Sequence, residues 1–269
     1  MFEPALGVSL VVISKQLDLE TIDAVRASKI ATLEITPAVF AGTGMKPHLK
    51  RMLSEGPVRA ASVHALFGGE HDVSVLDGEG QLAAAATARS AVELATQLGA
   101  GVVVFHASAE PIEPRERPAR LDQAASAFYQ IGLACTKAGV RGAVEILPRS
   151  CLCNTVEEAL TFLDVVGQDV LGVCLDTNHL MDRHAQLADS VRTLGDRLVT
   201  LHLSDYDGVD EKHWMPGADG GVVDWPAFMH ALRDIDYQGP FNYECRPPGE
   251  TAAERVRALE KNFEWLSGL

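Results

Sequence analysis

Short apolar runs rich in β-branched residues alternate with longer amphipathic stretches along the chain. This alternation predicts repeated βα units and a parallel sheet, because a strand that helices cover is apolar along its whole length. Eight runs are expected to be strands, and they cover residues 7–13, 31–36, 59–66, 101–107, 142–147, 172–176, 198–204 and 240–245.

Helices are expected between these strands over residues 82–98, 119–138 and 155–166. A glycine follows the last apolar turn of each, at Gly99, Gly139 and Gly167, where glycine readily ends a helix. Thr155 is followed three residues later by Glu158, which is the pattern of a capping box at a helix start.

Eight βα units are best accommodated by a single-domain α/β fold, a (β/α)8 TIM barrel over residues 1–269, because closure removes the exposed edges of a parallel sheet. The main alternative is an open doubly wound sheet. No glycine-rich dinucleotide motif follows the first strand and the chain has no phosphate-loop motif, so the nucleotide-binding form of that alternative lacks support.

The composition narrows the range of partners. A formal net charge of −14 argues against non-specific binding to nucleic acid or to an anionic membrane. The first four residues contain an acid, Glu3, where a signal peptide is basic, and the apolar run over residues 8–13 is too short to span a bilayer, so a cytoplasmic protein is expected. Five cysteines without zinc-finger spacing argue against a disulfide framework, and Cys151 and Cys153 are expected to lie in a loop rather than to bind a soft metal.

A polar side chain that can ionise lies at or near the carboxyl end of six of the expected strands. The chemistry of a barrel sits at the carboxyl ends of its strands, so these positions are candidate site residues. They are His64, His106, Glu145, Asp176, His202 and Glu244.

The carboxylates among them point to a metal. A lone strand-end histidine is usually a buried residue with ordinary hydrogen bonds, but a buried carboxylate is costly unless it is paired or metal-bound. These strands supply too few lysines and arginines to pair all three. Oxygen and nitrogen ligands suit one divalent ion, with Mn²⁺ expected and Mg²⁺, Co²⁺ or Zn²⁺ as alternatives. The predicted ligands are Glu145, Asp176, His202 and Glu244.

Several motifs carry a resemblance to a known family. They are Cys-Asn-Thr-Val-Glu-Glu at 153–158, Gly-Val-Cys-Leu-Asp-Thr-Asn-His ending at His179, Leu-His-Leu-Ser-Asp ending at Asp205, His-Trp-Met-Pro-Gly at 213–217 before Val-Asp-Trp, and Tyr-Glu-Cys-Arg-Pro around Glu244. With Glu145, they resemble the xylose-isomerase-like barrels, which comprise sugar epimerases and isomerases, inosose-processing enzymes and, more distantly, endonuclease IV.

The resemblance implies roles for these residues. The four predicted ligands would bind the catalytic metal, and His179 would contact a substrate hydroxyl, with His64 and His106 as further candidate contacts. Residues 205–224, which include Lys212 and His213, would form a mouth loop. His213 would contact substrate or remain an exposed loop residue, and Arg246 would clamp the substrate or neutralise carboxylates. The resemblance also implies a homo-oligomer, either a dimer or a tetramer.

The expected reaction is isomerisation or epimerisation of a sugar, keto sugar or inosose through an enediolate, which a divalent metal stabilises. Glu145 and Glu244 would remove and return the proton from opposite faces. A lyase or dehydratase would begin with the same step. Residues 149–153 lack the further glutamate that ketose 3-epimerases of this family usually carry there, and Cys-Leu-Cys-Asn-Thr with Arg-Pro looks closer to enzymes acting on inososes.

Two other functions remain open. An abasic-site endonuclease would use three zinc ions and the residues His64, His106, Glu145, Asp176, His179, His202, Glu211, His213 and Glu244. Against it, Glu211 stands where an aspartate is expected, and the mouth loops are not conspicuously basic. A barrel that only binds a sugar or a partner is the third alternative, and the presence of all four metal ligands argues against it.

Overall fold

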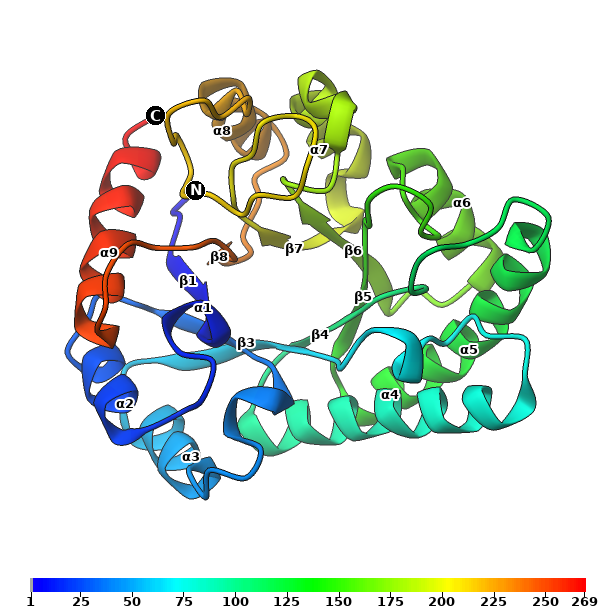
Figure 1. Ribbon diagram of the computed structural model, residues 1–269, viewed down its shortest axis with the longest axis horizontal. Coiled ribbons are helices and arrows are strands. Elements are labelled where there is room, and N and C mark those ends of the chain that lie inside the picture. Colours follow the sequence, from blue (N-terminus) through cyan, green and yellow to red (C-terminus); the bar gives the residue numbers. More distant parts are fainter. Residues whose placement is uncertain (1) are drawn as a thin grey trace.

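The computed structural model describes residues 2–269 as a ring of parallel strands surrounded by helices (Figure 1). Neighbouring strands follow the order β7-β6-β5-β4-β3-β2-β1-β8. Their bounds are β1 Leu6–Ser9, β2 Thr32–Ile35, β3 Arg59–His64, β4 Val102–Phe105, β5 Arg141–Glu145, β6 Leu171–Asp176, β7 Leu198–His202 and β8 Phe241–Tyr243.

The two ends of this order meet just beyond β7. Leu203 forms a parallel bridge with Tyr243 of β8. The Leu203 amide donates to Asn242 at 2.9 Å, and the Glu244 amide donates to the Leu203 carbonyl at 3.1 Å. The sheet therefore closes into the predicted (β/α)8 barrel, and the open doubly wound alternative is wrong.

The helices lie outside the barrel (Figure 1). They are α1 Leu10–Ile13, α2 Leu19–Arg26, α3 Lys46–Glu55, α4 Gly78–Leu98, α5 Arg117–Ala138, α6 Val156–Val166, α7 Leu187–Leu194, α8 Trp225–Asp234 and α9 Ala252–Ser267, with short 3-10 turns at Pro37–Phe40, Gly69–His71, Met181–Gln186 and Gly195–Arg197. Within residues 2–269, none of these helices is long and apolar enough to cross a bilayer.

The predicted helix ends are confirmed. Gly99, Gly139 and Gly167 end α4, α5 and α6 with φ angles of 72°, 70° and 64°, a conformation that glycine adopts without a steric penalty. The predicted capping box at α6 forms only in part. Thr155 accepts from the Glu158 amide, but the Glu158 carboxylate accepts from the Asn154 amide and from Arg117 instead of from the Thr155 amide.

The predicted carboxyl end of the first strand is wrong. Seven of the eight strands end within two residues of the predicted bounds, but β1 stops at Ser9 and the chain continues as α1. Leu10 and Ile13 are buried three residues apart, which is the spacing of one helix face. A short apolar run has no periodicity that separates these two outcomes.

Two register shifts set the side-chain alignment at the carboxyl ends of the strands. The first lies between β6 and β7 and pairs Asp176 with His202. The second lies between β2 and β3 and pairs Glu34 with Ser62. Shifts of this kind often re-aim side chains beside active sites.

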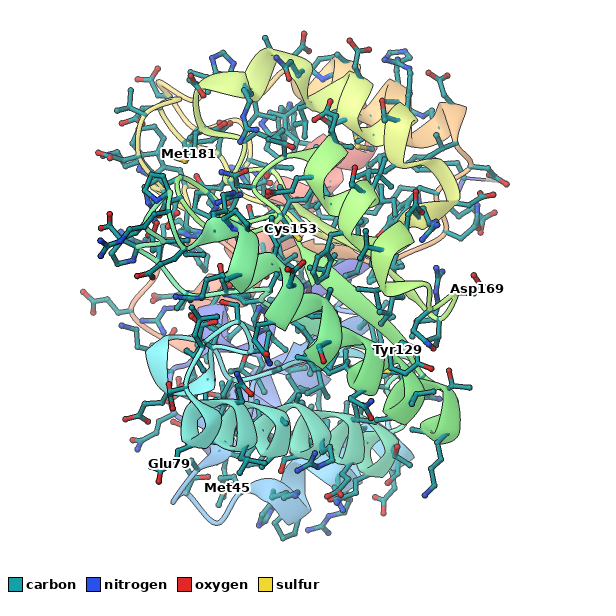
Figure 2. All side chains as sticks on the ribbon, turned by 90° about the vertical axis from the view of Figure 1, so that its right-hand side faces the viewer. Met45, Glu79, Tyr129, Cys153, Asp169 and Met181 are labelled. Atoms are coloured by element: carbon teal, nitrogen blue, oxygen red, sulfur yellow. The ribbon has the colours of Figure 1, made fainter. Side chains whose placement is uncertain are left out.

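The barrel has two distinct ends. Figure 2 shows it from the side, with Asp169 before β6 and Met181 after β6 at opposite ends of the molecule. Met45 and Glu79, which also follow strands, lie on the same side as Met181. This side is therefore the mouth at which the strands finish.

Candidate metal centre and substrate pocket

The four predicted metal ligands meet at the mouth of the barrel. Glu145, Asp176 and His202 are the last residues of β5, β6 and β7, and Glu244 directly follows β8. Each offers one ligand atom, and these four atoms all lie within 4.8 Å of one another. Residues that are far apart in the sequence thus form one compact cluster.

Three carboxylates converge on one nitrogen of this cluster. Nδ1 of His202 lies 2.7 Å from Oε2 of Glu244, 3.3 Å from Oε1 of Glu145 and 3.9 Å from Oδ2 of Asp176. Asp176 Oδ2 and Glu244 Oε2 are buried, yet they accept no well-aligned hydrogen bond from residues 2–269. Buried, unsatisfied oxygens around an imidazole nitrogen fit a divalent ion that takes oxygen and nitrogen ligands.

The ionisation of the cluster depends on the same contacts. Burial would raise the pKa of Glu145, but the imidazoles of His202 and His106 hold it well below its ordinary value. Burial would also raise the pKa of Glu244, but His202 lowers it to about 2. Burial would lower the pKa of His202, but the acidic groups around the ring raise it well above 6.5. Positive charge at the Nδ1 position is thus strongly favoured.

Three further histidines surround Glu145. Nε2 of His64 and Nε2 of His106 each lie 3.1 Å from Glu145 Oε2, and Nδ1 of His179 lies 3.3 Å from Oε1. Backbone carbonyls orient two of these rings, because Nδ1 of His64 contacts Ala65 O at 2.7 Å and Nδ1 of His179 contacts Ile146 O at 3.0 Å. The structure therefore brings all six strand-end candidates and His179 into one site.

These histidines differ in charge. Burial would lower the pKa of His64, but Glu145 raises it to about 9. Asp176 and Glu145 likewise outweigh burial at His179 and raise its pKa to about 10. At His106 burial prevails and the pKa is lowered. The site thus holds both charged and neutral imidazoles around a single carboxylate.

A cavity of about 340 Å³ opens above Glu145 and Glu244. Its floor includes His64, His106 and His179. Phe67, which the sequence analysis missed, stacks on His106 with a centroid distance of 4.5 Å and stays 55% exposed. A polar floor beside one exposed aromatic ring suits a small polar ligand that also presents apolar C–H groups.

An ion network spans the rim of this cavity. Arg149 Nε donates to both carboxylate oxygens of Glu110 at 2.9 and 3.0 Å, and Arg149 Nη1 lies 2.7 Å from Glu211 Oε1. The three residues come from the loops after β4, β5 and β7. No local sequence pattern links them, and the sequence analysis did not predict this network.

The remaining residues predicted to contact substrate or to form the mouth loop do not all line the cavity. His213 lines the cavity, and its Nδ1–H donates to the Glu244 carbonyl at 3.1 Å. Lys212 instead pairs with Asp207 and Asp210 inside its own loop. Arg246 is exposed and lines a neighbouring hollow together with His213 and Glu244. Arg246 is not among the residues that line the cavity above Glu145, and its role stays a prediction.

Glu34 of β2 is a buried site residue that the sequence analysis missed. It reaches His202 Nε2 at 3.2 Å, and Ser62 Oγ donates to it at 2.8 Å. The only sequence sign was a carboxylate within the apolar run Thr-Leu-Glu-Ile.

Other groups bear on the number of metal ions. His64, His106 and Glu145 form a second compact cluster, and His179, Glu211 and His213 form a third.

Cys151 and Cys153 are buried, and burial raises the pKa of both thiols, to about 12 for Cys151. Both cysteines lie in the loop between β5 and α6, as predicted.

The chain is similar in sequence to known sugar epimerases. The chain is 38% identical to a D-psicose 3-epimerase of Enterocloster bolteae over 98 residues, which are 36% of this chain and 30% of that protein. It is 31% identical to an L-ribulose 3-epimerase of Methylomonas sp. over 144 residues, which are 53% of this chain and 48% of that protein. The matches thus span less than two thirds of either relative.

A solved structure agrees with the fold. The protein IOLI, crystallised with a bound zinc atom, superposes with a TM-score of 0.81 at 17% identity over 97% of each chain. The family model described as xylose isomerase-like TIM barrel matches residues 22–267. This match confirms the resemblance inferred from the motifs, and the chain belongs to the xylose isomerase-like TIM barrel family.

Proposed function

We propose that this protein is a divalent-metal-dependent isomerase or epimerase of a sugar, keto sugar or inosose. The observation that carries the proposal is the convergence of three carboxylates on Nδ1 of His202 beneath a polar cavity. Its epimerase relatives support the same class of substrate.

Glu145, Asp176, His202 and Glu244 would hold the metal. Mn²⁺ is the expected ion, with Mg²⁺, Co²⁺ or Zn²⁺ as alternatives, because the donors are oxygens and one imidazole nitrogen. A divalent ion there would stabilise negative charge that develops on the substrate oxygens when a proton leaves the neighbouring carbon.

Glu145 and Glu244 would transfer that proton. Glu244 is the more accessible base, because its side chain is 26% exposed and lines the cavity. Glu145 is buried, and His64 and His106 both contact its Oε2. Because the two glutamates come from strands β5 and β8, they can act on different faces of a carbon held between them.

The other cavity residues would position the substrate. His106, His179 and His213 would offer a ring nitrogen to substrate hydroxyls, and His64, whose two nitrogens already contact Ala65 and Glu145, would contact the substrate with its ring. Phe67 would contact the apolar face of the sugar, and Arg149 would close the rim. A lyase or dehydratase acting on a keto sugar or inosose begins with the same proton abstraction and is the alternative outcome.

Solvent deuterium incorporation tests this proposal. Keto sugars and inososes are incubated in D₂O with the Mn²⁺-loaded protein, and exchange at the carbon beside the carbonyl is followed by NMR. At least one substrate is expected to take up deuterium, and its product separates epimerisation from elimination. A panel that shows no exchange with any carbonyl substrate would contradict enolisation.

A second candidate is an abasic-site phosphodiesterase that uses three zinc ions. Two of the additional clusters, around His106 and His213, favour it. Against it, Arg149 pairs with Glu211 of the third cluster, and the chain carries a net charge of −14. Three tightly bound zinc ions per chain and cleavage of abasic DNA would favour this function, whereas one exchangeable ion favours the sugar enzyme.

A further inference from the structure

Glu34 and His202 meet in the interior of the barrel. Glu34 lies on β2 and His202 on β7, and both side chains are fully buried. Nε2 of His202 lies 3.2 Å from Oε2 of Glu34 and 3.1 Å from Oε1. One nitrogen of the ring therefore faces Glu34, and the other faces the predicted metal ligands.

Glu34 is itself held in place. The register shift between β2 and β3 pairs Glu34 with Ser62, where an unshifted ladder would pair it with Ala61. Ser62 Oγ donates to Glu34 Oε2 at 2.8 Å. The carboxylate is thus fixed by a serine on the neighbouring strand and directed toward His202.

This contact determines which nitrogen of His202 carries a proton. A buried carboxylate beside an unprotonated nitrogen would bring two acceptors together, which is unfavourable. When a cation lies between Nδ1 and the three carboxylates that face it, Nε2 must therefore be the nitrogen that carries the proton. The lone pair of the imidazole ring then lies on Nδ1, which faces Glu145, Asp176 and Glu244. Proteins commonly fix metal-binding histidines through such an outer carboxylate.

We propose that Glu34 is a positioning residue for the metal centre, which holds the proton of His202 on Nε2 and so presents Nδ1 as the metal ligand. This proposal rests on the proposed function, because it requires a divalent ion at the cluster. Glu34 itself lies behind His202 and is not among the residues that line the cavity. Its effect on metal binding is therefore exerted through the imidazole.

Metal affinity in matched variants tests the proposal. Glu34→Gln keeps the shape of the side chain and removes its charge. It is expected to weaken Mn²⁺ binding by about 10- to 100-fold, measured by isothermal titration calorimetry. Asp72→Asn is the matched control, because Asp72 is another buried carboxylate that accepts from a serine, Ser74, and pairs with Arg120. The control is expected to bind Mn²⁺ like the wild type.

A double variant separates positioning from general loss of structure. In the His202→Asn background, where the amide oxygen can still offer the metal a ligand that alanine lacks, adding Glu34→Gln should change the remaining Mn²⁺ affinity by less than twofold, because the imidazole through which Glu34 acts is gone. An undiminished loss in that background would show that Glu34 acts by another route and would overturn the proposal. The thermal midpoint of each metal-free variant shows whether it is folded.

Nitrogen-15 NMR of histidine-labelled wild-type protein loaded with Zn²⁺ gives a direct readout, even where a variant fails to fold. The proposal predicts a proton on Nε2 of His202 and the metal on Nδ1. Metal on Nε2, or unchanged Mn²⁺ affinity in Glu34→Gln, would overturn this proposal and leave the proposed function standing. A wild-type protein that binds no divalent ion would contradict both.

Discussion

Oε2 of Glu244 lies 2.7 Å from Nδ1 of His202, with two further carboxylates facing the same nitrogen. Such a contact is favourable only if a positive charge lies between the two groups, either a proton on the ring or a bound cation. The family fold accounts for the position of the cluster at the mouth, and this charge requirement accounts for its chemistry.

Glu244→Gln tests the role of Glu244 in proton transfer. The amide can still offer an oxygen to the metal but cannot accept a proton, so deuterium incorporation should fall by about 10²- to 10⁴-fold. The rate is measured by NMR at saturating Mn²⁺, with metal content determined on the same sample. Full turnover by this variant with metal bound would rule out Glu244 as a proton-transfer group.

The stability of the metal-free protein should depend on pH through two histidines. The pKa of His64 is raised to about 9 and that of His179 to about 10, from 6.5. A pKa raised by folding adds stability that is complete below pH 6.5 and is lost as the pH rises through the folded value. The thermal midpoint of EDTA-treated protein is therefore expected to decline from pH 6.5 to pH 10.

Variants connect this decline to the two rings. His64→Asn and His179→Asn should each flatten the slope, whereas His230→Asn, an exposed residue on α8, should leave it unchanged. A thermal midpoint that rises over this pH range in the metal-free wild type would contradict the charge assignment of the site.

Arg149→Gln tests the rim network. The side chain of Arg149 is 46% exposed, so losing its ion pairs should change the free energy of unfolding by less than about 1 kcal/mol. Glu110 and Glu211 would then be free to move at the rim, and KM is expected to rise severalfold. Lys212→Gln is the control, because Lys212 pairs with Asp207 and Asp210 inside its own loop. Equal KM values for Arg149→Gln and the wild type would show that the network does not contribute to substrate binding.

The thiols should be unreactive in the folded protein. Burial raises the pKa of Cys135 and of Cys151 to about 12, and all five cysteines are buried. Because the thiolate is the reactive form, Ellman's reagent at pH 8 should label no cysteine until denaturant is added. Cys151, which lines the cavity, is the most demanding case. Its rapid labelling in native protein would contradict the buried position.

Much of the fold could be predicted because the pattern and the packing agree. Buried parallel strands require continuous apolar runs, and Gly99, Gly139 and Gly167 end helices through their own backbone freedom. The end of β1 could not be predicted, because the run over residues 8–13 suits either a strand or one helical turn. Ser9 precedes the helical turn, but its side chain makes no capping hydrogen bond that would mark the start of α1.

The candidate site was predictable where the topology alone brings residues together. Strand ends meet at the mouth, so Glu145, Asp176 and His202 could be grouped without coordinates. Glu34 could not be added, because its partner lies on a distant strand and a register shift sets its alignment. The rim network depends on the conformations of three separate loops, which no local pattern encodes.

The metal count of the cluster tests the central claim most directly. Isothermal titration of EDTA-treated protein with Mn²⁺ is expected to give one ion bound per chain in the wild type and no measurable binding in Asp176→Ala or His202→Ala. A wild-type protein that binds no ion would contradict a metal centre built from these four strand-end residues. Mn²⁺ binding that is retained in each of the two single variants would contradict it as well.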